Sequence, residues 1–455
     1  MDKILAQTES VCPICLQRIP AKRVQRGEDV YLEKLCSEHG PFSAVIWRGE
    51  PAYTQWVRPK TPSYPEHPFT EVRQGCPFDC GLCPEHRQHS CCVLLEVTQR
   101  CDLHCPVCFA DAGQGKESDI SLQDAENWYR RLLEAGGPYN IQLSGGEPCV
   151  RDDLADFIRL GKSLGFTFFQ LNTNGLRLAR DEAYLHDLVE AGLSTVFLQF
   201  DGTTDDIYQS IRGRRLMETK AKAIAACQRA GVGVVLVPTL IPGINTANIG
   251  AIIAFALSQM PAVRGVHFQP VSYFGRYPTA PADTDRITIP EVIRAIQAQT
   301  DGKIKAESFC PPGGENAACS FHGNFVLMPD GNEMALTRHK PECCCTPVAA
   351  AQGAIRSREF VARNWAAPEV IVDVPAVKGP SFGEWDTFLE RKQTHLFCVS
   401  GMAFQDAWTL DLDRLRDCYI HTASPDGRLV PFCAYNLTSQ SGRSLYRQLQ
   451  AVNER

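Results

Sequence analysis

Six cysteines of this chain form two copies of the pattern C-x3-C-x2-C. The two copies are Cys76, Cys80, Cys83 and Cys101, Cys105, Cys108. Three thiolates at this spacing can hold three irons of an iron–sulfur cubane from one loop, because cysteine thiolates are the usual ligands of such clusters. The fourth iron then takes a ligand from elsewhere in the chain or stays open for a substrate.

The sequence before each triplet separates their expected roles. Cys101 directly follows a strand-like run, CVLLEVT (92–98), whereas Cys76 follows polar sequence rich in turn residues. Enzymes built on parallel barrels place their chemistry at the carboxyl ends of the strands. We therefore expect the Cys101 triplet to be catalytic and the Cys76 triplet to be auxiliary, with Cys91 or Cys92 as a fourth ligand.

A third group of possible ligands lies near the N-terminus. Cys12 and Cys15 form a C-x2-C pair, Cys36 and His39 form a C-x2-H pair, and twenty residues with a hairpin turn at Gly27 separate them. Two such pairs on adjacent turns can present four ligands tetrahedrally to one zinc or iron ion. A buried thiol cluster without metal is the alternative.

The C-terminal third carries scattered cysteines that only the fold can bring together. The four that we expect to hold a second auxiliary cluster lie in loops bounded by Gly or Pro: Cys310, Cys319, Cys418 and Cys433, with Cys398 in reserve. The run Cys343, Cys344, Cys345 is less suited, because adjacent side chains point apart. We interpret Cys149 and Cys227 as buried free thiols, and His267 and His421 as structural histidines.

Between these groups, apolar strands alternate with amphipathic helices six times. Such alternation predicts parallel strands with right-handed crossovers, and six units are fewer than a full eightfold barrel. We therefore predict an α/β fold with a partial (β/α)6 barrel. The expected domains are a metal module (1–60), an auxiliary iron–sulfur segment (61–91), the barrel (92–275), and an irregular Cys-rich auxiliary-cluster cap (276–455).

Composition limits the classes of protein that fit. The chain has 455 residues, 44% hydrophobic and 22% charged, with a net charge of −6. Neither a basic stripe nor an apolar run of membrane-spanning length is present, so we expect no nucleic-acid partner, no transmembrane segment and a cytoplasmic location. In that compartment 21 cysteines indicate metal ligands rather than disulfides.

The second predicted strand ends in LSGGEP, at residues 143–148. Gly145 and Gly146 remove side chains where a backbone must approach a ligand closely, and the Glu147 carboxylate can pair with an ammonium group. A GGE triplet alone is most often just a turn. Directly after the second strand, with a cysteine triplet after the first, it indicates a binding site.

The order CDLHCPVC, LSGGEP, LNTNG resembles the radical S-adenosylmethionine (SAM) superfamily from residue 92 to about 275. The resemblance implies that the Cys101 triplet binds a [4Fe–4S] cluster whose open iron takes SAM. It also implies that Gly145, Gly146 and Glu147 contact the SAM amine. The segment from Asn172 to Asn174 would face the ribose or carboxylate, and PTLIPGIN the adenine. The residue before the last cysteine, often aromatic in the superfamily, is valine here.

The end of the sixth strand supplies further candidates. Gln269, Tyr273 and Arg276 follow this strand and face the mouth if the barrel is correct, so we expect all three to contact substrate, and Gln269 to contact the cofactor as well. Both flanks of the chain resemble a multi-cluster subgroup that includes archaeal tetraether lipid synthase and dihydropterin methylases. That resemblance implies auxiliary [4Fe–4S] clusters and an N-terminal rubredoxin-like or zinc-like site.

The function that we expect follows from this resemblance. One electron from a reductase, ferredoxin or flavodoxin cleaves SAM, and the 5′-deoxyadenosyl radical removes hydrogen from an unactivated carbon of a small molecule or lipid. Methylation or another alkylation of that carbon follows, and radical coupling of two alkyl chains is the alternative. A non-catalytic electron carrier is a rival from another class, but it would need no GGEP segment. A zinc-dependent nucleic-acid module conflicts with the acidic net charge.

Overall fold

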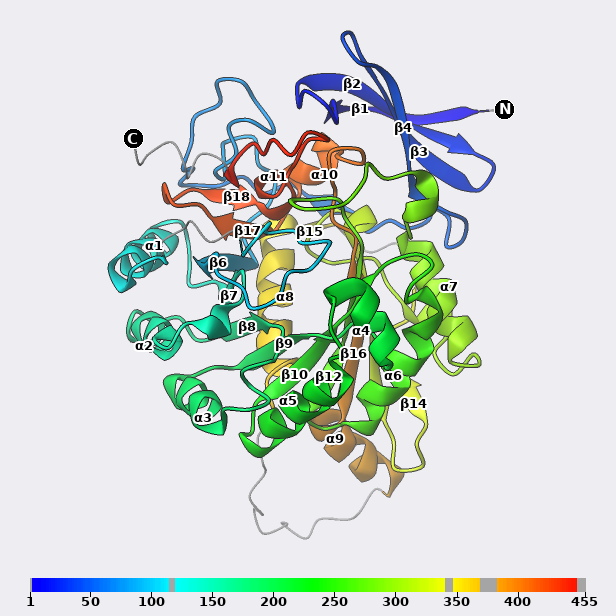
Figure 1. Cartoon of the computed structure of the whole chain (residues 1–455). Coiled ribbons are helices and arrows are strands. Elements are labelled where there is room, and N and C mark those ends of the chain that lie inside the picture. Colours follow the sequence, from blue (N-terminus) through cyan, green and yellow to red (C-terminus); the bar gives the residue numbers. More distant parts are fainter. Residues whose placement is uncertain (1, 114–118, 340–346, 369–382, 448–455) are drawn as a thin grey trace.

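Figure 1 shows the chain as a computed structural model, which describes residues 2–113, 119–339, 347–368 and 383–447. A small sheet of four strands sits at one end of a large curved sheet. Helices α1, α2 and α3 lie side by side along the outer side of the large sheet (Figure 1).

The small N-terminal sheet consists of antiparallel neighbours in chain order. Its strands are β1 (Lys3–Val11), β2 (Arg18–Arg26), β3 (Asp29–Cys36) and β4 (Gly40–Trp47). The turn between β2 and β3 passes through Gly27, whose φ of +61° lies in the left-handed region that glycine adopts without strain. The predicted hairpin at Gly27 is therefore confirmed.

The six predicted barrel strands are adjacent and parallel, in chain order. They are β6 (Cys92–Thr98), β7 (Asn140–Gly145), β8 (Phe169–Thr173), β9 (Thr195–Gln199), β10 (Gly233–Val237) and β12 (Val263–Pro270). The short β11 (Thr239–Leu240) adds to β12. Strands buried on both faces read as continuous apolar runs, which is why the sequence located them. The partial barrel is confirmed.

Helices connect these strands and bury their apolar stripes against the sheet. They are α1 (Leu122–Glu134), α2 (Leu154–Ser163), α3 (Glu182–Ala191), α4 (Asp205–Arg212), α5 (Met217–Arg229) and α6 (Ile249–Ser258). Ser121 and Asp124 form a capping box that begins α1. Gly192, with φ of +110°, ends α3. Tyr129 of α1 packs on Phe166 and Phe169, which joins the helix to the core.

The C-terminal region differs from the irregular cap that the sequence predicted. Strand β16 (Leu396–Met402) pairs in parallel with β12, and β17 (Ile420–Ala423) pairs in parallel with β6. The sheet continues through antiparallel strands β13 (Ser320–Leu327), β14 (Glu333–Ala335) and β18 (Leu429–Pro431). The region therefore extends the barrel at both edges. Over the described ranges the sheet stays open, with β14 and β18 at its ends.

Further short elements complete the C-terminal region. They are α7 (Ile289–Gln299), α8 (Ala350–Asn364), α9 (Glu384–Thr394), α10 (Leu412–Arg416), α11 (Phe432–Tyr435) and a two-stranded pair of β5 (Lys60–Thr61) with β15 (Val348–Ala349). Helix α8 runs along the barrel strands (Figure 1), and its Val361 lines the same cavity as side chains from β7 and β8. It therefore fills part of the inner side of the open barrel.

Buried polar contacts fasten the N-terminal sheet to the C-terminal region. Arg23 donates two hydrogen bonds to Asp411, at 2.6 and 3.0 Å. The fully buried Lys34 ammonium donates to the carbonyl of Ala407 at 2.7 Å, and burial lowers the pKa of Lys34 to about 7. The N-terminal sheet is therefore packed against the C-terminal region through these contacts, and is held by more than its chain linkage. Among the described residues, no helix combines the length and apolar character needed to cross a bilayer.

Candidate active site

The loop of the second cysteine triplet begins where β6 ends, at the carboxyl mouth of the barrel. Cys101, Cys105 and Cys108 all lie on the wall of one large cavity, of about 300 Å³. Burial raises the pKa of the Cys101 thiol to about 12, so this thiol is neutral at physiological pH when no metal is bound. An iron–sulfur cluster would bind these residues as thiolates, which couples loading of the cluster to loss of protons.

Arg276 holds the loop of the second cysteine triplet in place through hydrogen bonds, a role that the sequence did not predict. Its Nε donates to the carbonyl of Cys105 at 3.1 Å, and its backbone exchanges hydrogen bonds with Cys108 at 2.9 and 3.0 Å. Arg276 also pairs with Asp111 at 3.0 Å. The arginine therefore positions the cysteine loop, whereas the sequence predicted a substrate contact. Tyr273 donates its hydroxyl to the carbonyl of Asp285.

The two glycines of the GGE segment allow two loops to meet. A side chain at Gly145 would collide with the carbonyl oxygen of Thr98, and one at Gly146 with that of Arg100. Gly145 also has a φ of +122°. With no side chains in the way, the backbone N–H of Gly146 donates to the Thr98 carbonyl at 2.8 Å. The glycines hold the GGE segment against the start of the cysteine loop.

Glu147 joins the segments that follow β7 and β8. One carboxylate oxygen accepts from the Cys149 backbone at 3.0 Å and from the Thr173 hydroxyl at 2.7 Å, and the other accepts from the Asn174 backbone at 2.7 Å. Glu147 is 2% exposed, and burial raises its pKa. Ionised carboxylates offer about four lone-pair positions, so three internal bonds leave room for one further donor on the cavity side.

The remaining predicted cofactor contacts lie around the same cavity. Asn174 donates from its side chain to Asp102 in the cysteine loop at 2.6 Å, and its carbonyl accepts from the buried Lys220 at 2.6 Å. Asn172 and Gln269 both line the cavity. The tertiary structure thus brings all six predicted cofactor contacts to the cavity that contains the second cysteine triplet.

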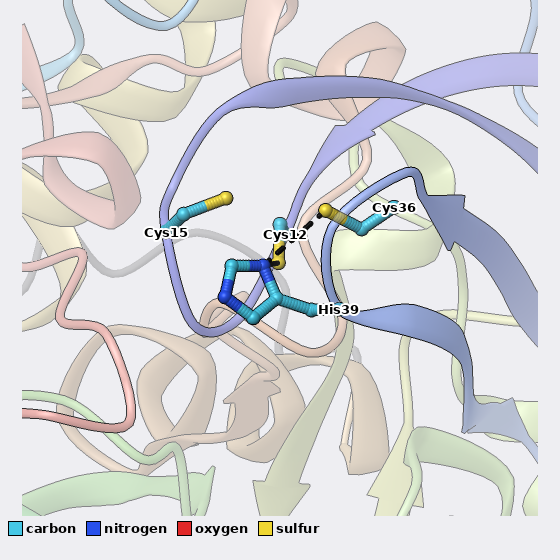
Figure 2. Close-up of side chains that lie close together, drawn as sticks. All are labelled: Cys12, Cys15, Cys36 and His39. Carbon is cyan, nitrogen blue, oxygen red and sulfur yellow. Dashed lines mark hydrogen bonds between the residues drawn. The ribbon is translucent and has the colours of Figure 1, made fainter.

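The N-terminal ligand group converges as its spacing predicted. Figure 2 shows Cys12, Cys15, Cys36 and His39 pointing toward one another from two adjacent turns. Their ligand atoms all lie within 4.8 Å of one another. His39 Nδ1 lies 3.7 Å from Cys12 Sγ and 3.5 Å from Cys36 Sγ. Three sulfurs and one nitrogen in this arrangement suit a closed, four-coordinate metal site.

Comparison with known proteins agrees with both sites. The chain matches the family model of the radical SAM superfamily over residues 95–256 and that of the HMPTM N-terminal zinc ribbon domain over residues 4–48. It is 34% identical to the 7,8-dihydro-6-hydroxymethylpterin dimethyltransferase of Methanocaldococcus jannaschii, over 94% of this chain and 93% of that relative. This chain belongs to the radical SAM superfamily.

Two further similarities are more limited in extent. A probable GTP 3',8-cyclase of Methanothermobacter marburgensis is 30% identical over 38% of this chain and 56% of that relative. The solved structure of Streptococcus suis SuiB bound to its precursor peptide SuiA is 16% identical, with a TM-score of 0.40, over 47% of this chain and 46% of that one. The near full-length match to the dimethyltransferase supports an enzyme.

In this radical SAM enzyme the first cysteine triplet lies apart from the large cavity. Cys76, Cys80 and Cys83 line a second, small cavity together with His86 and Arg416. Tyr446 holds their loop, since its hydroxyl accepts from the Cys80 backbone at 3.0 Å and donates to the Pro77 carbonyl at 2.6 Å.

The predicted fourth ligands of this triplet lie elsewhere. Cys91 and Cys92 are on the wall of the large cavity. Neither borders the small cavity that the first triplet lines. The Cys91 backbone N–H is bonded to the Tyr419 carbonyl.

The tail cysteines are only partly brought together. Burial, and then the proximity of Cys433 and Cys319, raises the pKa of Cys418. Arg414 lies beside Cys319, with Nη2 3.5 Å from Cys319 Sγ, and its buried Nε has no hydrogen-bond partner among the described residues. The positive charge of Arg414 also acts on Cys433, and a buried cation beside these thiols suits an anionic cluster. Cys310 lies elsewhere, its backbone paired with His322 and its side chain near Arg58.

The remaining cysteines and histidines predicted from the sequence lie mostly in buried positions. Cys149 and Cys227 are buried, as expected for free thiols, and Cys398 is buried on β16. The run 343–345 lies outside the described residues. His421 is fully buried beside Ser90, at 3.0 Å. His267 lines the large cavity.

Occupation of the N-terminal group is testable in the full chain. Replacing Cys12 and Cys15 by serine should remove one equivalent of zinc or iron, because a closed site with two thiolates missing holds metal weakly. Metal analysis should find the acid-labile sulfide unchanged, since this group is separate from both triplets. Cys227→Ala, at a buried cysteine within α5, serves as the matched control and should keep the metal. An unchanged metal content in the double variant would support the metal-free thiol alternative.

Proposed function

We propose that this radical SAM enzyme methylates a carbon of a small, uncharged heterocycle of the dihydropterin class. The Methanocaldococcus relative is named as a dihydropterin dimethyltransferase, and the match covers nearly the whole of both chains. The observation that carries the proposal in this chain is the wall of the large cavity. There the predicted SAM contacts adjoin a row of amide side chains.

The amide row consists of Gln142, Gln170 and Asn172, all on the cavity wall. Gln142 and Gln170 are paired neighbours on β7 and β8, and Asn172 lies two residues further, on the same face of its strand. Gln170 donates to Asn172 at 3.0 Å, while Asn172 lies 3.5 Å from Gln142 Oε1. The longer contact is weak, so these amides retain hydrogen-bonding capacity for a ligand.

The cavity wall carries little free charge. Apart from cysteine thiols and Tyr419, the described residues on this wall include three with acidic or basic side chains: Glu147, Arg212 and His267. Arg212 is paired with Asp201 through two hydrogen bonds at 2.7 and 2.8 Å. Burial lowers the pKa of His267 to about 4, so this ring is neutral at physiological pH. A neutral ligand with donors and acceptors on its edge suits such a wall, because buried amides need partners.

An aromatic group on the same wall suits a planar ligand. Phe197 and Trp365 stack with centroids 5.4 Å apart and an interplanar angle of 20°, and His267 lies 5.4 Å from Phe197. All three residues line the cavity. Aromatic faces favour offset stacking with another ring, so this group offers a surface on which a heterocycle can pack.

The same features disfavour the two rival functions. A cavity of about 300 Å³ is at the lower end of the range for small-molecule sites, and its amide row is ill suited to alkyl chains. Both points argue against coupling of two lipid chains. A non-catalytic electron carrier would need neither the GGE segment nor a substrate-sized cavity beside its cysteines.

The proposed roles follow from the contacts described above. Cys101, Cys105 and Cys108 would hold the [4Fe–4S] cluster at the cavity wall. When bound, the cluster and SAM supply the 5′-deoxyadenosyl radical. Glu147 orders the segment through Asn174 and would accept a hydrogen bond from the SAM amine. Apolar side chains such as Phe404 and Phe432 line the cavity and would keep water from the reacting carbon.

The other metal groups complete the proposal. The first triplet would hold one auxiliary [4Fe–4S] cluster, Cys319, Cys418 and Cys433 would hold a second, and the N-terminal group would hold zinc. The donor sets support this division, because soft thiolates suit iron–sulfur clusters and a closed set of three sulfurs and one nitrogen suits zinc. Electrons would come from a reductase, ferredoxin or flavodoxin.

Anaerobic turnover with 7,8-dihydro-6-hydroxymethylpterin, reductant and methyl-deuterated SAM tests the function. We expect 5′-deoxyadenosine together with a pterin that is heavier by one or two methyl groups. Deuterium in the product identifies SAM as the methyl donor, and an unlabelled methyl group identifies a separate one-carbon donor. A product that joins two substrate carbons supports the coupling alternative. Release of 5′-deoxyadenosine without any carbon gained by the substrate would contradict both carbon-joining functions.

A variant of the amide row separates substrate binding from cofactor binding in this assay. Gln170→Leu keeps the size of the side chain but removes its hydrogen bonds, which should raise the KM for the pterin by roughly tenfold. The affinity for SAM should change much less than the KM for the pterin, because Gln170 reaches the predicted SAM contact Asn172 only through one hydrogen bond, at 3.0 Å. Equal effects on pterin and SAM would show that Gln170 serves the fold of the cavity rather than the substrate.

A further inference from the structure

We infer that the imidazole of His86 is the fourth ligand of the cluster held by Cys76, Cys80 and Cys83. This inference rests on the proposed function, which places an auxiliary cluster at the first triplet. The small cavity that these three cysteines line has no fourth cysteine among the described residues on its wall. It does have two other side chains with ligand atoms, Glu85 and His86.

The position of His86 in the chain brings it to the cluster loop. The residue follows Cys83 by three positions, so the motif is C-x3-C-x2-C-x2-H. The His86 backbone N–H donates to the Cys83 carbonyl at 2.9 Å, which turns the chain back on itself. This turn brings His86 to the wall of the cavity that the three cysteines line.

A hydrogen bond selects which nitrogen of His86 can bind metal. Nε2 lies 2.7 Å from the carbonyl oxygen of Cys418. A carbonyl oxygen only accepts hydrogen bonds, so the proton of the neutral ring is on Nε2 and the lone pair is on Nδ1. Metal-binding histidines usually have this arrangement, with one ring nitrogen donating to a carbonyl or carboxylate and the other facing the metal.

Burial favours His86 over the competing side chains. His86 is 4% exposed, whereas Glu85 is exposed, and carboxylate oxygen is a harder ligand that suits iron–sulfur clusters less than nitrogen or sulfur does. Arg416 borders the same cavity but has no lone pair to give. Its positive charge lies near Cys76 and would offset part of the negative charge of a three-thiolate cluster.

The ligand set has a consequence for electron transfer. Replacing a thiolate by a neutral imidazole makes the cluster less negative, and histidine ligation raises the reduction potential of iron–sulfur centres. The Nε2–H bond also reaches the backbone of Cys418, one of the three tail cysteines. His86 therefore lies between the first triplet and the proposed second auxiliary group, so it connects the two through one ligand and one hydrogen bond.

The test uses the full chain with Cys101, Cys105 and Cys108 replaced by alanine, so that the catalytic cluster does not contribute. The protein is labelled with 15N-histidine, reduced with dithionite, and measured by pulsed electron paramagnetic resonance. We expect a strong nitrogen coupling that changes from the 14N to the 15N pattern on labelling. It should disappear in His86→Ala and persist in His89→Ala, the matched control three residues along the chain.

Two further variants keep the test decisive. His86→Cys should retain the iron and sulfide content of the parent protein and lose the nitrogen coupling, which covers the case in which His86→Ala fails to fold. Serine at Cys76, Cys80 and Cys83 should remove the signal and so assigns it to this cluster. A cluster at this triplet without histidine coupling, or with coupling that survives in His86→Cys, would overturn the inference alone. A parent protein without iron and sulfide at the triplet would overturn the auxiliary-cluster proposal with it.

Discussion

Alanine at Cys101, Cys105 and Cys108 together is expected to abolish the formation of 5′-deoxyadenosine from SAM. The three thiols form one ligand unit on the wall of the large cavity. Removal of such a unit lowers activity by roughly three orders of magnitude or more. The variant should still bind iron and sulfide, because the first triplet and the tail cysteines lie in other places. Anaerobic product analysis with quantification of iron and sulfide measures both effects.

A conservative control is available in the same barrel. Cys227 lies within α5, fully buried in the hydrophobic core and away from the cavity wall. Cys227→Ala should therefore cleave SAM at close to the parental rate. SAM cleavage by the triple variant under reductant would show that the catalytic and auxiliary roles of the two triplets are reversed.

Replacing Glu147 by glutamine is expected to weaken SAM binding by roughly 5- to 150-fold. Both carboxylate oxygens accept hydrogen bonds, from Cys149, Thr173 and Asn174. Glutamine turns one acceptor into a donor that faces another donor, and leaving a buried polar group unsatisfied costs about 1–3 kcal/mol. Losing about 1–3 kcal/mol in the segment that contacts SAM corresponds to a roughly 5- to 150-fold weaker affinity for SAM.

Equilibrium binding of SAM, measured alongside iron content and cluster absorbance, checks this expectation. The cluster should be retained, because Glu147 touches none of the three cysteine side chains through a hydrogen bond in the described structure. Glu126→Gln is the matched control, since this half-buried carboxylate on α1 lies away from the cavity and pairs only with Arg130 among the described ion pairs. Parental SAM affinity in Glu147→Gln would place the SAM pocket elsewhere.

The local features of the site could be predicted from the sequence because neighbouring residues determine them. The spacing of Cys12, Cys15, Cys36 and His39 places their ligand atoms on two adjacent turns of the small sheet. The apolar runs of the barrel locate its parallel strands, since both faces of each strand are buried. The two glycines at the end of β7 predict a point of close approach, and the structure shows two backbones meeting there.

Other features depend on pairing between distant segments. Strands β16 and β17 extend the barrel at its two edges, and their parallel partner strands lie more than a hundred residues away in the chain. No local repeat of apolar residues therefore predicts these strands. From the sequence this region therefore looks irregular. The amide row is hidden for a different reason, because YNIQL and FTFFQL look like apolar strands and their amide positions do not stand out from the apolar neighbours.

The sequence by itself thus determined the cysteine motifs, the metal module and the parallel barrel, through short spacings and continuous apolar runs. The tertiary structure alone decided which cysteines share a site. It placed Cys91 on the wall of the large cavity rather than that of the first triplet, and it put Cys418 within electrostatic range of Cys319 and Cys433. Spacing determines ligand geometry only within a turn or loop, where the backbone restricts the reach of each side chain. Across long separations, burial and strand pairing determine which thiols meet.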